Sequence, residues 1–247
     1  MSVDLGLPRN VSEHGAAIDA LLHRAHLYEA ALVALFVGFI VFAVVRFHHR
    51  QKARYLPGVS PRAAAGVLAV AVGVFLVVDG TFFVESWRIL HEQLWNFDIP
   101  DRDPRTTRVE VNAHQWAWDF RQPGPDGVFN TADDVVSWNE LRVPVDAPVS
   151  MQLSSTDVVH SLYLPNFRQK MDAVPGQLNR LWFRPTEPGD FEIACSQHCG
   201  VNHYRMRAVL HVMPRAEYDR WLREAAAIAE RAHDPDDAEA QWGWPWR

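Results

Sequence analysis

The chain has 247 residues, of which 48% are hydrophobic, and a formal net charge of −6 at pH 7. This acidic balance excludes the uniformly basic surface of a general nucleic-acid-binding protein. The sequence contains only two cysteines, which excludes a disulfide scaffold. Apolar residues are concentrated in two long stretches near the N-terminus and a polar remainder follows, so a purely soluble protein is excluded as well.

The two apolar stretches, 27–47 and 63–84, are each long enough to cross a membrane. The second contains a single charged residue, Asp79. About 20 apolar residues, rising 1.5 Å each, span the roughly 30 Å of bilayer hydrocarbon. Buried helices of a soluble core are the alternative, but such helices usually keep a polar stripe, and none is visible here. We therefore expect a transmembrane helical hairpin over 27–97.

The loop between the stretches fixes the expected orientation. Residues 46–62 hold five Lys/Arg and no acid, whereas residues 1–26 hold only two Lys/Arg. Positively charged loops stay in the cytoplasm, so both chain ends are expected outside. No secretory signal precedes the first stretch, which is therefore retained as an anchor. We expect residues 1–26 to form a short external helix before it.

Two acids near the external end of the second stretch do not suit lipid. Asp79 and Glu85 stand where the span continues as DGTFFVESW. An acid in a span usually faces protein or water and can mark a functional site. Alternatively, Asp79 hydrogen-bonds to a neighbouring membrane subunit. Either interpretation requires a partner helix.

Composition changes beyond residue 97, where 23 acids stand against 16 bases. The whole negative excess is thus outside, where it would steer a basic partner or simply aid solubility. Short β-like segments separated by Pro, Gly and Asp predict a sandwich or Greek-key barrel over 98–213. They are RVEVNA, SWNELRVPV, VSMQLSS, LNRLWFRP, GDFEIAC and MRAVLHVM.

Residues 214–247 complete the predicted organisation with a helix and a loosely ordered tail. The helix is indicated by apolar residues at helical spacing in PRAEYDRWLREAAAIAERA. The acidic stretch PGPDGVFNTADDV, 123–135, lacks the full spacing of an EF-hand calcium loop. We interpret it as an exposed loop.

The segment CSQHCGVNHYRM carries the strongest chemical signal. It brings Cys195, Cys199, His203 and Met206 onto one loop between two β-like segments. Soft thiolate and thioether donors with imidazole select copper over hard cations. His160, 35 residues before Cys195, is a further ligand that a two-sheet fold can bring to the loop.

Three other interpretations of this loop compete. The two cysteines could form a disulfide, which an exported domain permits. A structural zinc site could use both cysteines with His160 and either His198 or His203, but zinc has no use for Met206. A blue-copper site needs only one cysteine. The second cysteine favours two metals bridged by both sulfurs.

The loop resembles the binuclear CuA motif of subunit II of haem-copper oxidases, C-S-E-x-C-G-x-x-H-x-x-M. SSTDVVHSLYLPNFRQKMDAVPGQLN is similar to the family's histidine-bearing segment and its K-x-D-A-x-P-G element, and VNAHQWAWDF to its Q-W-x-W segment. The resemblance spans 27–225. It implies two transmembrane helices, an all-β cupredoxin-like Greek-key domain and a C-terminal helix.

The resemblance also assigns roles to residues. It implies copper ligation by His160, Cys195, Cys199, His203, Met206 and the main-chain carbonyl of Gln197. Electrons would enter at Trp116, with Trp118 the less favoured choice, and Asp172 would lie near the docking surface of the donor. A turn-stabilising role accounts for Asp172 equally well. His198 has no family role and is expected to be a surface histidine.

The implied function is electron entry into a cytochrome c oxidase. Electrons would come from cytochrome c or another soluble donor and pass to a haem-bearing catalytic membrane subunit that reduces oxygen, with no bond chemistry in this chain. The sequence has no C-x-x-C-H, so the donor should be separate. The expected location is a bacterial-type inner membrane, with the copper domain on the periplasmic side.

Two departures from the family pattern bear on this function. Gln197 replaces a glutamate whose side chain helps to hold an interface magnesium ion, which places that ion in doubt. No acid occurs between Glu29 and Asp79, where the oxidases often have one that opens a proton pathway. The alternative is the CuA-bearing small subunit of a related nitric oxide reductase. A membrane-anchored copper carrier would need only a simpler site.

Overall fold

The computed structural model describes residues 6–48, 58 and 60–233. They form two compact units, a helical unit of Ala17–Gln93 and a β unit that combines Gly6–Ala16 with the chain from Leu94 onward. Most of the basic loop and the tail from residue 234 lie outside the described residues. The predictions for those two segments therefore stay predictions.

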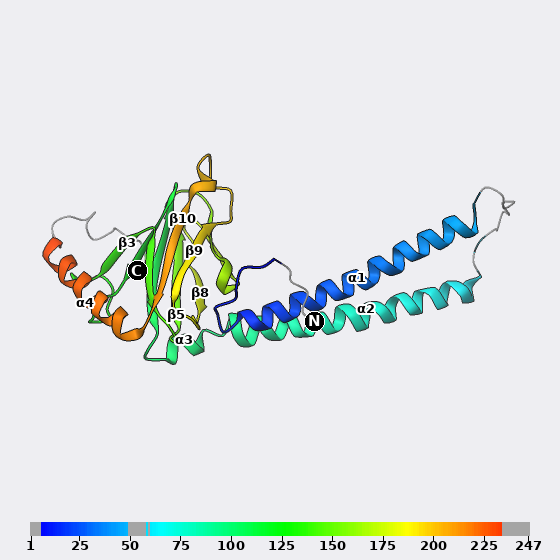
Figure 1. The fold of residues 1–247 in the computed structure, drawn as a ribbon, viewed down its shortest axis with the longest axis horizontal. Coiled ribbons are helices and arrows are strands. Elements are labelled where there is room, and N and C mark those ends of the chain that lie inside the picture. The colour runs from blue at the N-terminus through cyan, green and yellow to red at the C-terminus, as the bar shows by residue number, and fades with distance from the viewer. Residues whose placement is uncertain (1–5, 49–57, 59, 234–247) are drawn as a thin grey trace. The chain divides into compact units, whose positions relative to one another are not determined.

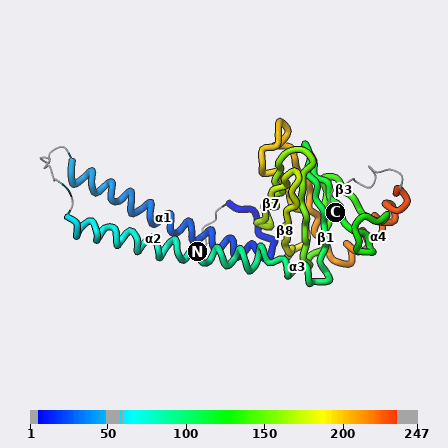
Figure 2. The backbone as a smooth tube through the Cα atoms, turned by 180° about the vertical axis from the view of Figure 1, so that it is seen from behind, coloured from blue at the N-terminus to red at the C-terminus, as the bar shows by residue number. Residues whose placement is uncertain are grey.

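The helical unit is a hairpin of α1 (Gly15–Arg46) and α2 (Pro61–Ile89), which lie side by side in Figures 1 and 2. Ser60 caps α2, because its side chain accepts a hydrogen bond from the Ala63 N–H at 3.3 Å. Both helices are long and apolar enough to cross a membrane. Their apolar side chains are mostly exposed, as lipid-facing side chains would be.

The expected separate helix over 1–26 is wrong. Residues 15–26 are the first turns of α1, which runs without a break from Gly15. Alanine and leucine favour helix and no breaker separates this segment from the first span. Residues 6–14 belong instead to the β unit.

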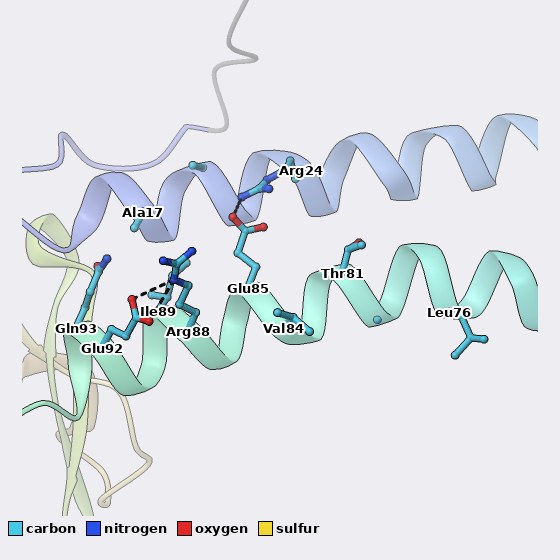
Figure 3. A pocket seen from close by; sticks show the side chains of 12 residues that line it. Ala17, Arg24, Leu76, Thr81, Val84, Glu85, Arg88, Ile89, Glu92 and Gln93 are labelled. Atoms are coloured by element: carbon cyan, nitrogen blue, oxygen red, sulfur yellow. Dashed lines mark hydrogen bonds and ion pairs between the residues drawn. The ribbon is translucent and has the colours of Figure 1, made fainter.

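The paired ends of α1 and α2 carry charged side chains that meet within the helical unit (Figure 3). Arg24 of α1 forms an ion pair with Glu85 of α2, and Arg88 binds Glu92 at 3.1 Å. These side chains line a pocket of about 910 Å³ together with small residues such as Gly80. Glu85 thus has its ionic partner on α1, whereas Asp79 is exposed on α2.

The β unit contains two five-stranded sheets. The first has the order β3 (Val135–Trp138), β2 (Ala117–Gln122), β1 (Thr107–His114), β5 (Val149–Ser155) and β8 (Asn179–Phe183). The second has the order β4 (Glu140–Pro144), β10 (Arg207–Met213), β9 (Gly189–Cys195), β6 (His160–Leu164) and β7 (Gln169–Ala173). β1–β5 and β4–β10 are parallel pairs, and the other pairs are antiparallel.

The hydrophobic core draws on buried side chains from both sheets. On β1, Val109, Val111 and Ala113 are buried at every second position, whereas Arg108 is exposed and Asn112 is partly exposed. Residues two apart on a strand share one face, and this face lies in the core. Leu162 of β6 lies in the same core from the second sheet. The core therefore anchors the ends of the strands that carry the site.

The segment SWNELRVPV, 137–145, is expected to be one strand but is divided between β3 and β4. Asn139 adopts a left-handed backbone with φ +56°, which an asparagine tolerates better than most residues. Its side-chain oxygen accepts a hydrogen bond from the Trp118 N–H at 2.8 Å. The chain thereby passes from β3 in the first sheet to β4 in the second.

Short helices and one longer helix complete the β unit. The short ones are α3 (Asp98–Arg102), η2 (Pro165–Phe167) and η3 (His203–Arg205). A further short helix, η1 (Leu90–Leu94), directly follows α2. The predicted C-terminal helix is α4 (Arg215–Ala232). Its buried Tyr218 hydroxyl lies 2.9 Å from the Gln122 amide nitrogen, and Arg142 stacks 5.2 Å from the centre of the Trp221 ring. The predicted order of helices, β-sheet domain and C-terminal helix is confirmed.

The segment 6–16 is held on the β unit by buried side chains. Val11 is fully buried, and the Ser12 hydroxyl donates to the Phe167 carbonyl at 2.9 Å. His14 packs edge-on against Trp182, with ring centres 4.3 Å apart, and its Nδ1 lies 3.4 Å from the Gln169 amide nitrogen. Burial, assisted by the Arg184 charge and opposed by Glu13, lowers the pKa of His14 below its ordinary value.

The buried His14 predicts a pH dependence of stability. Because its pKa is lower folded than unfolded, protonation favours the unfolded state, and stability is lost as the pH falls below the ordinary histidine value. We expect the thermal midpoint of the full chain in detergent to fall more for wild type than for His14→Gln between pH 7.5 and 5.5. Equal losses would show that His14 does not carry this dependence.

Candidate metal centre

The second sheet brings the sequence-predicted ligands to one end. His160 is the first residue of β6 and Cys195 the last residue of β9, while Met206 directly precedes β10. The loop is closed by hydrogen bonds from the Cys195 N–H to the Met206 carbonyl at 3.1 Å and from the Ser196 N–H to the Ser161 carbonyl at 3.0 Å. Antiparallel pairing thus places residues distant in sequence side by side.

The two cysteines are neighbours without being bonded. Their sulfurs lie 3.8 Å apart and both thiols are free, whereas a disulfide requires about 2.05 Å. The ligand atoms of His160, Cys195 and Cys199 all lie within 4.8 Å of one another. The disulfide interpretation is therefore wrong for this structure.

Further donor atoms lie close to each of the two sulfurs. His160 Nδ1 lies 3.1 Å from Met206 Sδ and 4.0 Å from Cys195 Sγ. His203 Nδ1 lies 3.6 Å from Cys199 Sγ, and the Gln197 carbonyl oxygen lies 3.2 Å from Cys195 Sγ. All the ligands expected from the sequence are thus gathered at one place.

Met206 makes the donor set unlike that of a structural zinc site. Its Sδ lies 3.7 Å from Cys199 Sγ, and the side chain is buried. Two thiols, a thioether and two imidazoles form a soft donor set that suits copper. A zinc ion would bind the two thiols and the two imidazoles and leave the thioether uncoordinated. The residues present therefore fit a pair of copper ions better than a single zinc ion.

The two thiols differ in acidity. Burial, the largest single influence, raises the pKa of Cys195, but hydrogen bonds with His160 and the backbone at Ser161 and Gln197 outweigh it and lower that pKa to about 6. Burial and then the negative charge of Cys195 raise the pKa of Cys199 to about 12. The two shifts have opposite directions, and a bound metal would displace any proton that either sulfur still carries.

The turn after β1, at Gln115 and Trp116, is hydrogen-bonded to the loop that carries the cysteines. The Cys199 carbonyl accepts hydrogen bonds from Gln115 Nε2 at 2.7 Å and from Trp116 Nε1 at 3.3 Å. Gly200 has φ +124°, and a Cβ there would lie 2.9 Å from Gln115 Nε2 and 3.1 Å from the Trp116 ring. Glycine is therefore required by both the backbone and the close approach of the turn.

The other residues that the sequence indicated differ in their exposure to solvent. Trp116 is partly exposed, whereas Trp118 is fully buried with its ring centre 6.1 Å from that of His160. Asp172 is an exposed residue of β7 and accepts a hydrogen bond from the Ser161 hydroxyl at 2.6 Å. His198 is exposed, with its ring centre 5.6 Å from that of His203.

Sequence reasoning missed one side chain at the site, Asp157. Its Oδ1 lies 2.9 Å from His160 Nε2. The only signal available was its position three residues before the histidine, in TDVVH, and an acid in a turn is ordinarily read as a turn former.

Comparisons with known proteins agree with this site. The family profile "Cytochrome C oxidase subunit II, periplasmic domain" matches residues 107–213. The chain is 33% identical over 215 residues to "Alternative cytochrome c oxidase subunit 2" of Bradyrhizobium diazoefficiens, covering 77% of this chain and 74% of the relative. It is 30% identical over 229 residues to "Cytochrome c oxidase subunit 2" of Cereibacter sphaeroides, covering 79% and 72%.

A solved structure is also similar. The crystal structure of the periplasmic domain of subunit II of cytochrome oxidase from Bradyrhizobium japonicum is 27% identical, covers 49% of this chain and 94% of that chain, and has a TM-score of 0.45.

The fold and the site define a protein with two long apolar helices and a β-sheet domain that carries a cysteine–histidine cluster able to hold metal. The chain belongs to the cytochrome c oxidase subunit 2 family. It is accordingly a subunit of an oxidoreductase complex, and its two long apolar helices indicate a membrane protein.

Gly200 provides a test of how the turn and the loop fit together. We expect Gly200→Ala to lose about 1–3 kcal/mol of stability from the backbone conformation alone and to weaken copper retention by pushing Gln115 away. Gly127→Ala is the matched control, since Gly127 has φ +69° but open space around it. Copper content after dialysis against a chelator measures the effect, and equal retention in both variants would contradict it.

Proposed function

We propose that this chain is the electron-entry subunit of a haem-copper terminal oxidase. It accepts electrons from cytochrome c, or another soluble donor, at a binuclear CuA centre and passes them to the haem centres of a catalytic membrane subunit that reduces oxygen. The observation that carries this proposal is the pair of free thiols flanked by His160, Met206, His203 and the Gln197 carbonyl. Relatives named as cytochrome c oxidase subunit 2 support the same conclusion.

The donor set is large enough for two copper ions. Cys195 and Cys199 would hold both ions, together with His160, Met206, His203 and the Gln197 carbonyl. When bound, two coppers sharing charge through two thiolates supply one-electron transfer with little change in geometry. This chain contributes the ligand side chains and keeps them in fixed positions, which is the role that a protein has toward a redox cofactor.

Rigid strands and burial keep the ligands in position. His160 is completely buried, and Cys199 and Met206 are 3% and 1% exposed. Ligands on strands packed into a core move less than ligands on free loops. Their burial also shields the sulfurs of Cys199 and Met206 from water, which favours repeated oxidation and reduction without rearrangement.

Trp116 is the proposed point of electron entry. It is partly exposed and donates its indole N–H to the carbonyl of Cys199, a proposed ligand. Asp172 would contribute to donor docking, and the negative excess beyond residue 97 would attract a basic donor at a rate that falls with ionic strength.

The proposed location is a bacterial-type inner membrane, with α1 and α2 spanning it and the copper domain on the periplasmic side. Lys and Arg in the loop between the helices favour a cytoplasmic loop. Gln197 supplies its carbonyl to copper, but its neutral side chain would hold magnesium more weakly than a glutamate would. An interface magnesium ion is therefore not part of the proposal.

The bridging thiols give the first test. We expect the full chain, loaded with copper in detergent, to show an EPR spectrum delocalised over two coppers, and Cys195→Ser to lose it completely because one bridge is gone. His198→Gln is the matched control, since this exposed neighbour is not a proposed ligand and its replacement should leave the spectrum intact. A colourless chain that binds zinc in place of copper would refute the proposal.

Electron entry gives the second test. We expect Trp116→Phe to slow oxygen consumption by the complex with reduced cytochrome c several-fold, because the shorter ring loses its hydrogen bond to Cys199. Trp138→Phe, at a tryptophan that is 69% exposed on β3, should not change it.

Equal rates for both variants would contradict a role for Trp116. A wild-type complex that consumed nitric oxide but not oxygen would favour the alternative function, the small subunit of a nitric oxide reductase. The lack of an acid between Glu29 and Asp79 supports that alternative.

A further inference from the structure

Asp157 connects two parts of the metal site that lie on different strands. It occupies the turn between β5 and β6, and its side chain is 31% exposed. One carboxylate oxygen, Oδ1, lies 2.9 Å from His160 Nε2. The other, Oδ2, accepts a hydrogen bond from the Gln115 backbone N–H at 2.7 Å. Both carboxylate oxygens thus have a partner within the protein.

The carboxylate is itself held in place. Its Oδ1 accepts a hydrogen bond from the Val158 N–H at 2.6 Å, and the Ser155 hydroxyl lies 3.3 Å from the same oxygen. Three groups from residues 155–160 and one from the turn after β1 therefore contact this carboxylate. A surface acid that served only to attract a donor would need none of these contacts.

The contact with His160 determines which ring nitrogen can bind metal. A carboxylate accepts hydrogen bonds, so His160 Nε2 carries a proton, and Nδ1 is the nitrogen that a metal would bind in place of a proton. Nδ1 is the nitrogen that faces Met206 Sδ at 3.1 Å. Because the ring is completely buried, the Nε2 proton would have no solvent to replace a lost carboxylate.

The contact with Gln115 connects Asp157 to the cysteine loop. Gln115 and Trp116 both donate to the Cys199 carbonyl. The chain of contacts therefore runs from His160 through Asp157 to the Gln115–Trp116 turn and on to Cys199. Both proposed copper positions and the proposed electron-entry tryptophan depend on this one carboxylate.

We infer that Asp157 is a positioning residue that orients His160 toward the metal and fixes the Trp116 turn against the cysteine loop. This inference rests on the proposed copper function. Partners outside the ligand set commonly change metal affinity or activity by about 10- to 100-fold when they are removed.

The experiment compares Asp157→Asn with Asp219→Asn in the full chain in detergent. Asparagine keeps the size but offers a single acceptor oxygen, so it cannot serve both His160 Nε2 and the Gln115 N–H. Asp219 is an acid on α4 that pairs with Arg215, and its replacement removes the same charge elsewhere. Copper affinity by chelator competition, the EPR spectrum, and the rate of reduction by cytochrome c at low and high salt are measured.

For Asp157→Asn we expect copper affinity about 10- to 100-fold weaker, an altered spectrum, and slower reduction at both salt concentrations. Asp219→Asn should match wild type. A change confined to reduction at low salt, with the spectrum and affinity unaltered, would mean that Asp157 serves donor docking and would overturn the inference. Wild-type behaviour in every measurement would overturn it too.

Two further arms keep the result interpretable. If copper-free Asp157→Asn is unfolded, Asp157→Glu, which keeps the charge but displaces the carboxylate, is judged by the same criteria. If wild type itself shows no two-copper spectrum, the proposed function fails, and that failure is separate from the behaviour of the Asp157 variants.

Discussion

Two sulfurs that lie 3.8 Å apart and remain unbonded are the constraint on which this structure depends. That spacing is too long for a disulfide and requires each thiol to be held by its surroundings. Cys195 is held through backbone pairing at the end of β9, and Cys199 through its carbonyl, which accepts two side-chain hydrogen bonds from the turn after β1. The second sheet holds Cys195, and the turn after β1 in the first sheet holds Cys199. The spacing of the sulfurs therefore depends on how the two sheets pack together in the core.

The rest of the β unit can be understood as support for that spacing. His160 starts the strand beside β9, and pairing of Leu162 with Cys195 sets the register between them. Gly200 allows the loop to approach the Trp116 ring, which no larger residue could do without displacing it. The same contacts that stabilise the loop therefore also join a partly exposed aromatic ring to a buried ligand, which is what an electron-transfer site needs.

Much of this organisation could be predicted from the sequence, for identifiable reasons. The two long helices follow from the length of the apolar stretches, the C-terminal helix from helical periodicity, and the loop ligands from their spacing in CSQHCGVNHYRM. The division of 137–145 at Asn139 could not be predicted, because it depends on a hydrogen bond with Trp118 on another strand. The start of α1 at Gly15 was missed, since nothing local distinguishes a membrane helix from the turns that precede it. Asp157 was missed because its contact with Gln115, on the turn after β1, is set by tertiary structure.

The central claim is that both sulfurs hold a pair of copper ions. X-ray absorption at the copper edge, with metal analysis of the full chain purified in detergent, tests this most directly. The account predicts two coppers per chain, each bonded to two sulfurs and separated by a short metal–metal distance. One metal ion per chain, or copper bonded to a single sulfur, would contradict it.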